Sequence, residues 1–132
     1  MSISLSKLKK FDKEQDYAQV AQWWEAQDFA PIAPECLPET GYIVNDCVAG
    51  FMYKTDSKFA WIEWIVSDPE SNPLVRRASV PILVDTLVEA AREEGFTRII
   101  SSIEHPSLKK VYTEAGAIEA DQNMTNYIWR LD

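Results

Sequence analysis

Apolar and polar residues follow one another along the chain in runs whose periods predict alternating strands and helices. Near the start, Ile3, Leu5 and Leu8 fall among polar residues, which predicts a first strand that ends near Phe11. In residues 14–27 the apolar positions recur at helical spacing, and glutamines and glutamates are available for the solvent-exposed face. This segment predicts the first helix.

Two β-prone runs come next, residues 42–44 and residues 48–53, and Asn45 and Asp46 lie between them. Asparagine and aspartate tolerate the left-handed backbone that a tight hairpin turn needs. Residues 58–66 form a third run of the same kind. The pattern predicts three consecutive antiparallel strands after a proline-containing loop.

The most regular stripe lies in residues 80–91, where apolar residues recur at i, i+3, i+4, i+7, i+8 and i+11: Val80, Leu83, Val84, Leu87, Val88 and Ala91. Gly95 marks the end of this helix. Residues 98–103 form a β-branched run that a short crossover would place parallel to an earlier strand. A right-handed βαβ unit is expected.

Pro106 can occupy the first turn of a further helix that runs to about Glu114 and ends at Gly116. Residues 118–120 and 125–131 are then expected to form a closing antiparallel pair of strands. The predicted order is β-α-β-β-β-α-β-α-β-β, with room for a short helical turn before the hairpin. The expected fold class is α/β, a mixed and mostly antiparallel sheet with one parallel βαβ unit and helices on both faces.

With 132 residues, of which 46% are apolar, the chain is expected to form one domain. Its formal net charge of −8 disfavours nucleic acid and favours a cationic partner such as an amine. Cys36 and Cys47 have no neighbours at zinc-ligand spacing, so no metal site is expected. No run is apolar and long enough for a membrane span, so a cytoplasmic protein is expected.

Two segments carry a resemblance to a known family: residues 61–91, and residues 99–127 with His105, Leu108, Val111, Tyr112, Gly116 and Ala117 at its motif positions. In register and order they resemble the GNAT superfamily of acyl-CoA-dependent N-acyltransferases. The resemblance covers nearly the whole chain and implies acetyl-CoA as co-substrate. It implies that Tyr112 protonates the departing thiolate and that His105 lies beside the cofactor. The alternatives are that Tyr112 only packs in the core and that His105 is a turn or cap residue.

The resemblance also implies a loop that binds the CoA diphosphate through backbone N–H groups at a helix start. The matching stretch is Arg76, Arg77, Ala78, Ser79 and Val80, followed by Pro81. Ser79 and Pro81 replace two small residues of the family pattern, and proline removes a backbone donor. Asn72 and Pro73 offer a competing helix start, which would move the free amides away from the usual cofactor position. Both arginines could instead be solvated.

Glu63 lies in a strand between two tryptophans, with Trp61, Glu63 and Ile65 expected on one face and Ile62, Trp64 and Val66 on the other. The resemblance implies that Glu63 is the base that deprotonates an amine acceptor. Alternatively, it faces solvent or pairs with Arg98. The resemblance also implies that backbone donors around Val66, Ser67 and Ser101 position the pantetheine arm. It implies an acceptor mouth at Trp23, Trp24 and residues 31–38.

These residues predict an acetyltransferase that acts by direct transfer on a small amine or a protein lysine. The alternatives are a catalytically inactive GNAT-fold module that modulates a protein partner, or an acyl-CoA sensor without turnover. The resemblance is also consistent with a homodimer, and small acidic proteins of this kind occur among phage-encoded host modulators.

Overall fold

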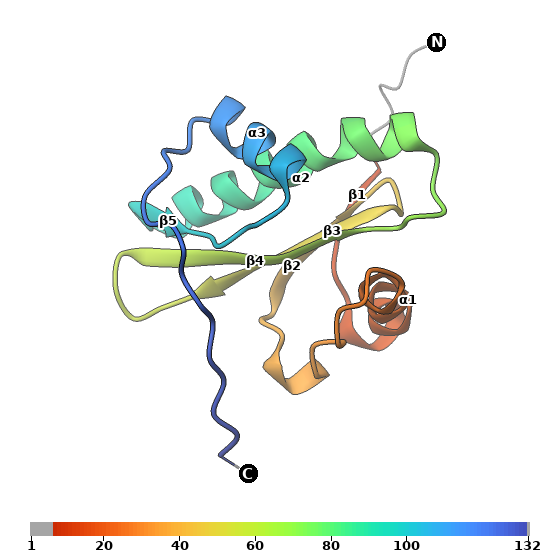
Figure 1. Ribbon diagram of the computed structural model, residues 1–132, viewed down its shortest axis with the longest axis horizontal. Coiled ribbons are helices and arrows are strands. Elements are labelled where there is room, and N and C mark those ends of the chain that lie inside the picture. The colour runs from red at the N-terminus through yellow and green to blue at the C-terminus, as the bar shows by residue number, and fades with distance from the viewer. Residues whose placement is uncertain (1–6, 132) are drawn as a thin grey trace.

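The computed structural model describes residues 7–131 and contains five strands and three α-helices in the order β-α-β-β-β-α-β-α, with a short 3-10 turn before the second strand (Figure 1). The strands are β1 (Leu8–Lys10), β2 (Thr40–Val44), β3 (Val48–Lys54), β4 (Phe59–Ser67) and β5 (Arg98–Ile100). The helices are α1 (Lys13–Ala26), α2 (Pro73–Glu93) and α3 (Pro106–Glu114), and the 3-10 turn η1 is Pro34–Cys36. Ile3 and Leu5 of the expected first strand lie outside the described residues.

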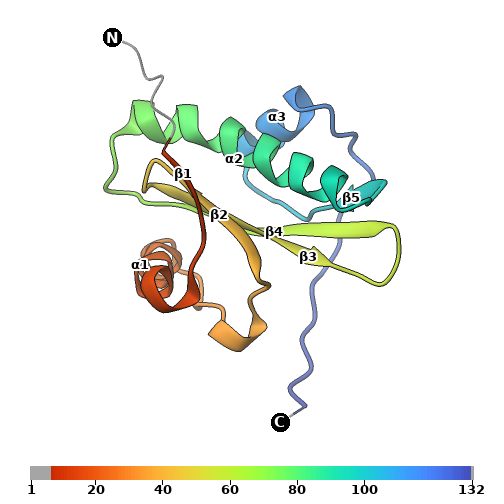
Figure 2. The same cartoon turned by 180° about the vertical axis from the view of Figure 1, so that it is seen from behind.

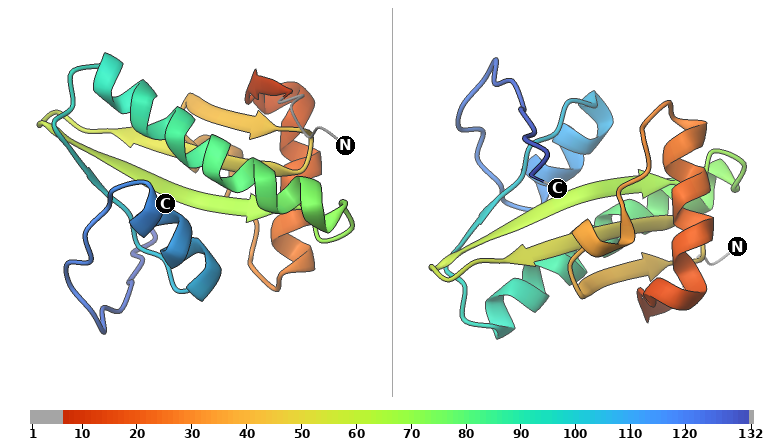
Figure 3. Two further views of the ribbon diagram at one scale, coloured as in Figure 1. Left: turned by 90° about the horizontal axis from the view of Figure 1, so that it is seen from above. Right: turned by 90° about the horizontal axis from the view of Figure 1, so that it is seen from below.

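The strands lie side by side in chain order, β1 to β5, with antiparallel pairing throughout except for the parallel pair β4 and β5. Helices α2 and α3 cover one face of the sheet and α1 covers the other, as Figures 1 and 2 show from opposite sides. Seen from above, α2 crosses the sheet obliquely with α3 beside it (Figure 3). The expected mixed sheet with one parallel βαβ unit is therefore confirmed.

Local sequence signals determine the turn between β2 and β3 and the start of helix α1. Asn45 and Asp46 both take positive φ, 53° and 51°, in the three-residue turn, residues 45–47, that joins β2 to β3. At the first helix, the Asp12 carboxylate accepts the N–H groups of Glu14 and Gln15 at 2.9 and 3.2 Å. Two of the free donors of α1 are thereby satisfied.

The sheet separates two apolar cores, and the central strand β3 contributes to both. The core on the α1 side contains Trp23, Trp24, Ile43, Phe51 and Val66, among others. The core on the α2 side contains Met52, Ile62, Leu83, Leu87 and Ala91, among others. Because β3 is covered on both faces, five successive residues from Val48 to Met52 are buried.

A β-bulge in β4 overturns the strict alternation expected for that strand. Ala49 pairs with Val66 and Phe51 pairs with Glu63, so two residues of β4 face the single residue Gly50. The first of the two, Trp64, has a φ of 62°. As a result Ile65 packs in the α2-side core and Val66 in the α1-side core, which reverses the faces expected for both.

Helix α2 begins at Pro73, with Asn72 as its N-cap, and continues through Pro81 to Glu93. The alternative helix start at Asn72 and Pro73 is therefore confirmed. Pro81 lies on the exposed side of the helix, where water can reach the carbonyl that lacks its usual N–H partner. Among residues 7–131, no helix has the length and apolarity that crossing a membrane requires.

The closing pair of strands expected in residues 118–120 and 125–131 is wrong, because residues 117–131 contain no strand. The chain leaves α3 through Gly116, at a φ of 99°, and runs past the sheet to the side of α1 (Figures 1 and 2). An alternating pattern shows only that a segment is able to pair. Pairing also needs a neighbouring strand edge, and β5 has only three residues.

We expect Leu83→Ala in α2 to lower the free energy of unfolding by about 2–5 kcal/mol, because it leaves a cavity at a fully buried side chain. The matched control is Leu74→Ala in the same helix, where the side chain is 60% exposed and the change should stay within about 0.5 kcal/mol. Urea unfolding measures both. Equal losses in the two variants would contradict the assignment of the buried face of α2.

Candidate functional site

The candidate site lies where β4 and β5 part. The two strands pair over three residues each, from Phe59 and Arg98 to Trp61 and Ile100, and β4 then continues to Ser67 without a partner in β5. The chain after β5 turns instead toward α3. We call this point the fork.

Two hydroxyl groups close the fork. Ser101 Oγ donates to the carbonyl of Ile62 at 2.6 Å, directly beyond the last paired residues. Ser101 Oγ also lies 2.7 Å from the hydroxyl of Tyr112 in α3. A serine hydroxyl carries one proton, and that proton goes to Ile62, so Tyr112 is the donor of the second bond. The phenol, the serine and the β4 carbonyl therefore form a directed chain of hydrogen bonds.

Glu63 lies at the same fork, one residue beyond Ile62. Its Oε1 accepts the backbone N–H of Ser102 at 3.0 Å, which places the carboxylate between β4 and the segment that follows β5. Burial raises the pKa of the half-buried Glu63 carboxyl above its ordinary value, and the Ser102 N–H lowers it in part. The structure therefore brings Glu63 and Tyr112, which are 49 positions apart, to one site.

Burial is also the main influence on Tyr112 and raises its pKa to about 12. The hydrogen bond to Ser101 acts in the opposite direction, and the negative charge of Glu63 adds to the increase. At neutral pH Tyr112 is a protonated hydrogen-bond donor.

The segment that joins β4 to α2, residues 68–72, ends at Asn72, which accepts hydrogen bonds from the first backbone N–H groups of α2. Asn72 Oδ1 accepts the N–H groups of Leu74 and Val75 at 2.9 and 3.4 Å, and its carbonyl accepts that of Arg76 at 2.9 Å. Pro73 has no N–H to offer. The donors of the first turn are thus satisfied within the chain.

The Arg76 side chain folds back over the same segment. Its Nη1 donates to the carbonyls of Asp68 and Ser71 at 3.2 and 2.9 Å and to the Ser71 hydroxyl at 3.2 Å. The guanidinium therefore sits among oxygen atoms that converge on it. Arg77, the next residue, is exposed.

The other residues expected around a cofactor diphosphate, Ala78, Ser79 and Val80, lie inside α2 and not in a loop. Ser79 is fully buried; its Oγ donates to the Val75 carbonyl at 2.6 Å and accepts from Asn45 Nδ2 at 2.9 Å. This contact attaches α2 to the β2–β3 turn. Backbone amides in the interior of a helix are bonded within that helix.

Four further candidates have clear places. His105 is the N-cap of α3, and its Nδ1 accepts the N–H of Ser107 at 3.2 Å. Val66 and Ser67 both pair with β3, and the Ser67 carbonyl also accepts from Gln27 at 2.8 Å. Trp23, which was expected to line a groove, is buried with Trp24 in the α1-side core.

Sequence reasoning missed the side chains of Ser101 and Tyr53. Ser101 was considered only for its backbone, although a polar residue directly after a strand of a βαβ unit is a usable signal. Tyr53 accepts the indole N–H of Trp64 at 2.7 Å and donates to the Cys36 carbonyl at 2.7 Å, so it holds the bulged residue in place. No local pattern announces that contact.

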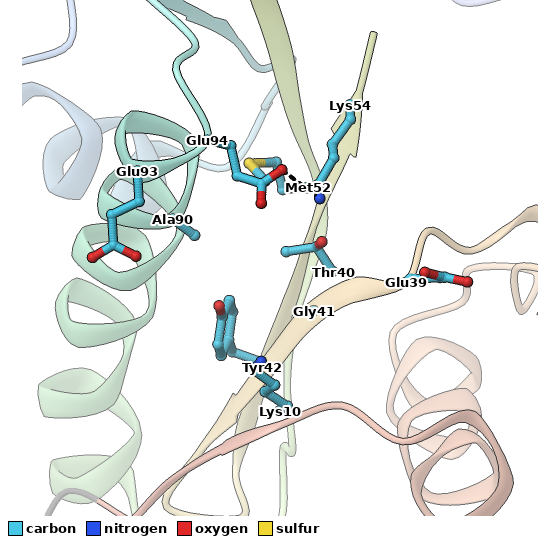
Figure 4. Close-up of a pocket in the computed structure, with 10 residues that line it drawn as sticks. All are labelled: Lys10, Glu39, Thr40, Gly41, Tyr42, Met52, Lys54, Ala90, Glu93 and Glu94. Atoms are coloured by element: carbon cyan, nitrogen blue, oxygen red, sulfur yellow. Dashed lines mark ion pairs between the residues drawn. The ribbon is translucent and has the colours of Figure 1, made fainter.

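A pocket of about 260 Å³ lies at the other end of α2 and shares no residue with the fork (Figure 4). Its walls come from the C-terminal turns of α2 and from β2 and β3, and the ion pair between Lys54 and Glu94 crosses it. Its charged side chains are two lysines and three glutamates: Lys10, Lys54, Glu39, Glu93 and Glu94. This excess of carboxylates makes the pocket unsuited to a phosphate.

No protein-family model matches the chain, and no curated protein resembles it significantly in sequence. Solved structures do resemble it. Glucosamine-6-phosphate N-acetyltransferase from Arabidopsis thaliana has a TM-score of 0.66 at 13% identity, with 94% of this chain and 99% of that chain covered. An aminoglycoside acetyltransferase from a soil metagenomic sample has a TM-score of 0.66 at 11% identity, with 99% and 100% covered.

A predicted acetyltransferase of Clostridium acetobutylicum, solved with acetyl-CoA, gives a TM-score of 0.65 at 14% identity and covers 93% of this chain and 96% of that one. These proteins are acetyltransferases of the GNAT type, and the likeness extends over nearly the whole chain. The protein therefore has the GNAT fold.

We expect Glu63→Gln to raise the melting temperature at pH 8 by about 1–3 °C and to leave it nearly unchanged at pH 4. The pKa of Glu63 is higher in the folded protein than the ordinary 4.5, so the folded state favours the protonated carboxyl. This preference stabilises the fold fully only at pH values below 4.5. The contribution is lost as the pH rises through the folded-state pKa. Glutamine stays neutral and can still accept from Ser102.

Calorimetric melting at both pH values checks this expectation, with the exposed Glu93→Gln as control. A lower melting temperature for Glu63→Gln at pH 8 would show that the charged carboxylate stabilises the fold.

Proposed function

We propose that the protein is an N-acyltransferase that moves an acetyl group from a pantetheine thioester, such as that of acetyl-CoA, to a primary amine. The observation that carries this proposal is the grouping of Glu63, Ser101 and Tyr112 at the fork of a GNAT fold. Base, hydroxyl and phenol come from β4, the end of β5 and α3. Acyl transfer needs a proton acceptor and a donor for the leaving group side by side, and the fork supplies both.

The reaction is written as direct transfer. The amine nitrogen forms a bond to the thioester carbon, the carbon–sulfur bond breaks, and the electron pair of that bond leaves on sulfur. An acceptor that arrives as an ammonium first loses one proton to solvent. The neutral amine then loses one proton to Glu63, and the thiolate gains one from Glu63 through solvent, so that an amide and a thiol are formed and the base is restored. No covalent intermediate on the protein is required.

Glu63 acts as the base in this scheme. Its raised pKa makes the carboxylate a better proton acceptor than an exposed glutamate. The Ser102 N–H holds Oε1, which leaves Oε2 for an ammonium group or a bridging water. A protein of net charge −8 also attracts a cationic acceptor.

Tyr112 acts chiefly as a hydrogen-bond donor to the departing sulfur. With a pKa of about 12, full transfer of its proton to a thiolate whose thiol has a pKa of about 8.5 is uphill by roughly 5 kcal/mol. A hydrogen bond to the developing negative charge does not carry that penalty. To make it, the phenol exchanges its bond to Ser101 for one to sulfur.

The acceptor is proposed only as a primary amine, either a small molecule or a protein lysine. Among the similar structures, one protein is an aminoglycoside acetyltransferase and another acetylates glucosamine 6-phosphate. The shared chemistry is an amine on a polar scaffold. A cytoplasmic location would give such an enzyme access to both kinds of acceptor.

We also propose a homodimer, supported by the apolar side chains that the C-terminal segment exposes: Ile118, Met124, Tyr127, Ile128, Trp129 and Leu131. Large apolar side chains gathered on one segment are usually covered in an assembly. Analytical ultracentrifugation should find about twice the mass of one chain, and Trp129→Ser should shift the equilibrium toward the monomer. A monomer at all concentrations would contradict the proposal.

We expect Glu63→Gln to lower kcat about a hundredfold and Tyr112→Phe to lower it about tenfold, with donor affinity unchanged in both. The measurement is loss of thioester absorbance with acetyl-CoA and a panel of amines, including a polyamine and a lysine peptide. The matched control is Glu93→Gln, at an exposed position near the C-terminal end of α2. Unchanged rates in the two fork variants would remove the assigned roles.

The second candidate function is a non-catalytic module that binds a protein partner, or an acyl-CoA sensor without turnover. The observation that favours it is the closed helix start, where Asn72 and Arg76 use the donors that would otherwise bind phosphate. Calorimetry distinguishes the candidates. Absence of heat with any acyl thioester at millimolar concentration favours the module, and heat without acetylated product favours the sensor.

A further inference from the structure

The two ends of a coenzyme A thioester meet very different surroundings in this protein. The fork, which faces the reacting end, has the groups that acyl transfer requires. The start of α2, where the fold would receive the diphosphate, does not fit an anion. This disagreement concerns the donor, and it rests on the function proposed above.

Free backbone donors are the first requirement of a diphosphate site at a helix start. Here Leu74 and Val75 donate to the Asn72 side chain, Arg76 donates to the Asn72 carbonyl, and Pro73 has no N–H. A phosphate oxygen would have to displace the Asn72 cap to reach any of them. The first turn therefore offers no open nest of N–H groups.

Charge is the second requirement. The carbonyls of Asp68 and Ser71 and the Ser71 hydroxyl all point at the Arg76 guanidinium. If Arg76 moved to bind a phosphate, these oxygen atoms would be left facing an anion without their donor. The carboxylates of Asp68 and Glu70, in the same short segment, add negative charge. The two carboxylates balance the charges of Arg76 and Arg77, so the corner offers no net attraction to a diphosphate.

The residues that would line the next turn give no substitute. Ser79 is fully buried and its hydroxyl is engaged by Val75 and Asn45. Pro81 has no N–H and lies inside the helix. The pocket at the far end of α2 carries more carboxylates than ammonium groups, so it does not replace the missing anion site.

We propose that the acyl donor is recognised through its acyl-pantetheine thioester arm alone, and that the nucleotide diphosphate of coenzyme A contributes little to binding. The free β4 edge beyond Ile62 can pair with the amides of a pantetheine arm, because these residues have no partner in β5. Acyl-CoA, acyl-phosphopantetheine on a carrier protein and free acyl-pantetheine share this arm. The chemistry of recognition is common to all three.

The test is calorimetric titration of the full chain with three donors: acetyl-CoA, S-acetyl-4′-phosphopantetheine and S-acetylpantetheine. We expect dissociation constants within about threefold of each other. Each charge-assisted bond to a phosphate would contribute roughly tenfold or more in affinity. Acetyl-CoA binding more than tenfold tighter than S-acetylpantetheine would overturn the inference while the acyltransferase function stands. Failure of all three donors to bind at millimolar concentration would overturn both.

Arginine variants test the same point at the helix start. We expect Arg76→Ala to lower thermal stability, because it removes the hydrogen bonds that hold residues 68–72 against α2. We expect the affinity ratio of acetyl-CoA to S-acetylpantetheine to stay unchanged. The matched control is Arg77→Ala, one exposed position further along. A selective loss of acetyl-CoA affinity in either variant would overturn the inference. If Arg76→Ala does not fold, Arg77→Ala and the ratio in the unchanged protein still decide.

A surface for phosphate would also make binding sensitive to salt. We expect the acetyl-CoA dissociation constant to change less than twofold between 50 and 300 mM salt, because the N–H groups at the start of α2 are already bonded within the chain. A steep salt dependence for acetyl-CoA that is absent for S-acetylpantetheine would contradict the proposal.

Discussion

The single proton of the Ser101 hydroxyl fixes the geometry of the candidate site. Because that proton goes to the Ile62 carbonyl, the oxygen of Ser101 is left to accept, and Tyr112 must turn its phenol toward the fork. Helix α3 has no buried residue of its own, so its position depends heavily on such contacts. One hydroxyl therefore joins the point where β5 leaves the sheet to the helix that supplies the phenol. The bond that positions Tyr112 is also the bond that chemistry would have to exchange.

The bulge in β4 has an equally direct effect on what surrounds Glu63. An additional residue in left-handed conformation lets Glu63 stay opposite Phe51 while Ile65 moves to the α2-side core. A bulky residue with positive φ is strained, and the indole bond from Trp64 to Tyr53 offsets part of that strain. Gly50 makes the arrangement possible, since a Cβ there would lie 3.0 Å from Ile65 and 3.1 Å from both Leu83 and Leu87. The strand therefore bends where its edge becomes free.

Sequence patterns predicted those parts of the fold that local rules control. The hairpin followed from Asn45 and Asp46, and α2 from its apolar stripe. The bulge was not predictable, because tryptophan is one of the last residues expected at positive φ. The C-terminal strands failed for a different reason, since residues 125–131 have the composition of a strand but the preceding strand, β5, offers only three residues to pair with.

In the candidate site, too, some features could be predicted from the sequence and others depend on contacts between distant residues. Glu63 and Tyr112 were identified by resemblance, yet their meeting depends on the Ser101 hydroxyl and the Ser102 N–H, which were not among the predicted contacts. At the helix start, two signals competed: the register of the family loop at Arg76, and the local cap at Asn72 with Pro73. The local signal won, because a side-chain cap satisfies two donors at once and a proline at N1 is pre-set for the helix.

That outcome has a consequence for any ligand of this fold. A helix N-terminus holds a small number of free N–H groups, and they stabilise either the folded chain or a bound anion. A glycine-rich start keeps them open and leaves the free protein less stable, whereas the sequence from Asp68 to Arg76 satisfies them permanently. At the fork, polar groups remain available for a ligand. The β4 edge beyond Ile62 stays unpaired on the β5 side, and Glu63 keeps one oxygen free of the Ser102 bond. An open fork beside a closed anion corner is the arrangement expected if the reacting arm of the donor contributes more to binding than its nucleotide.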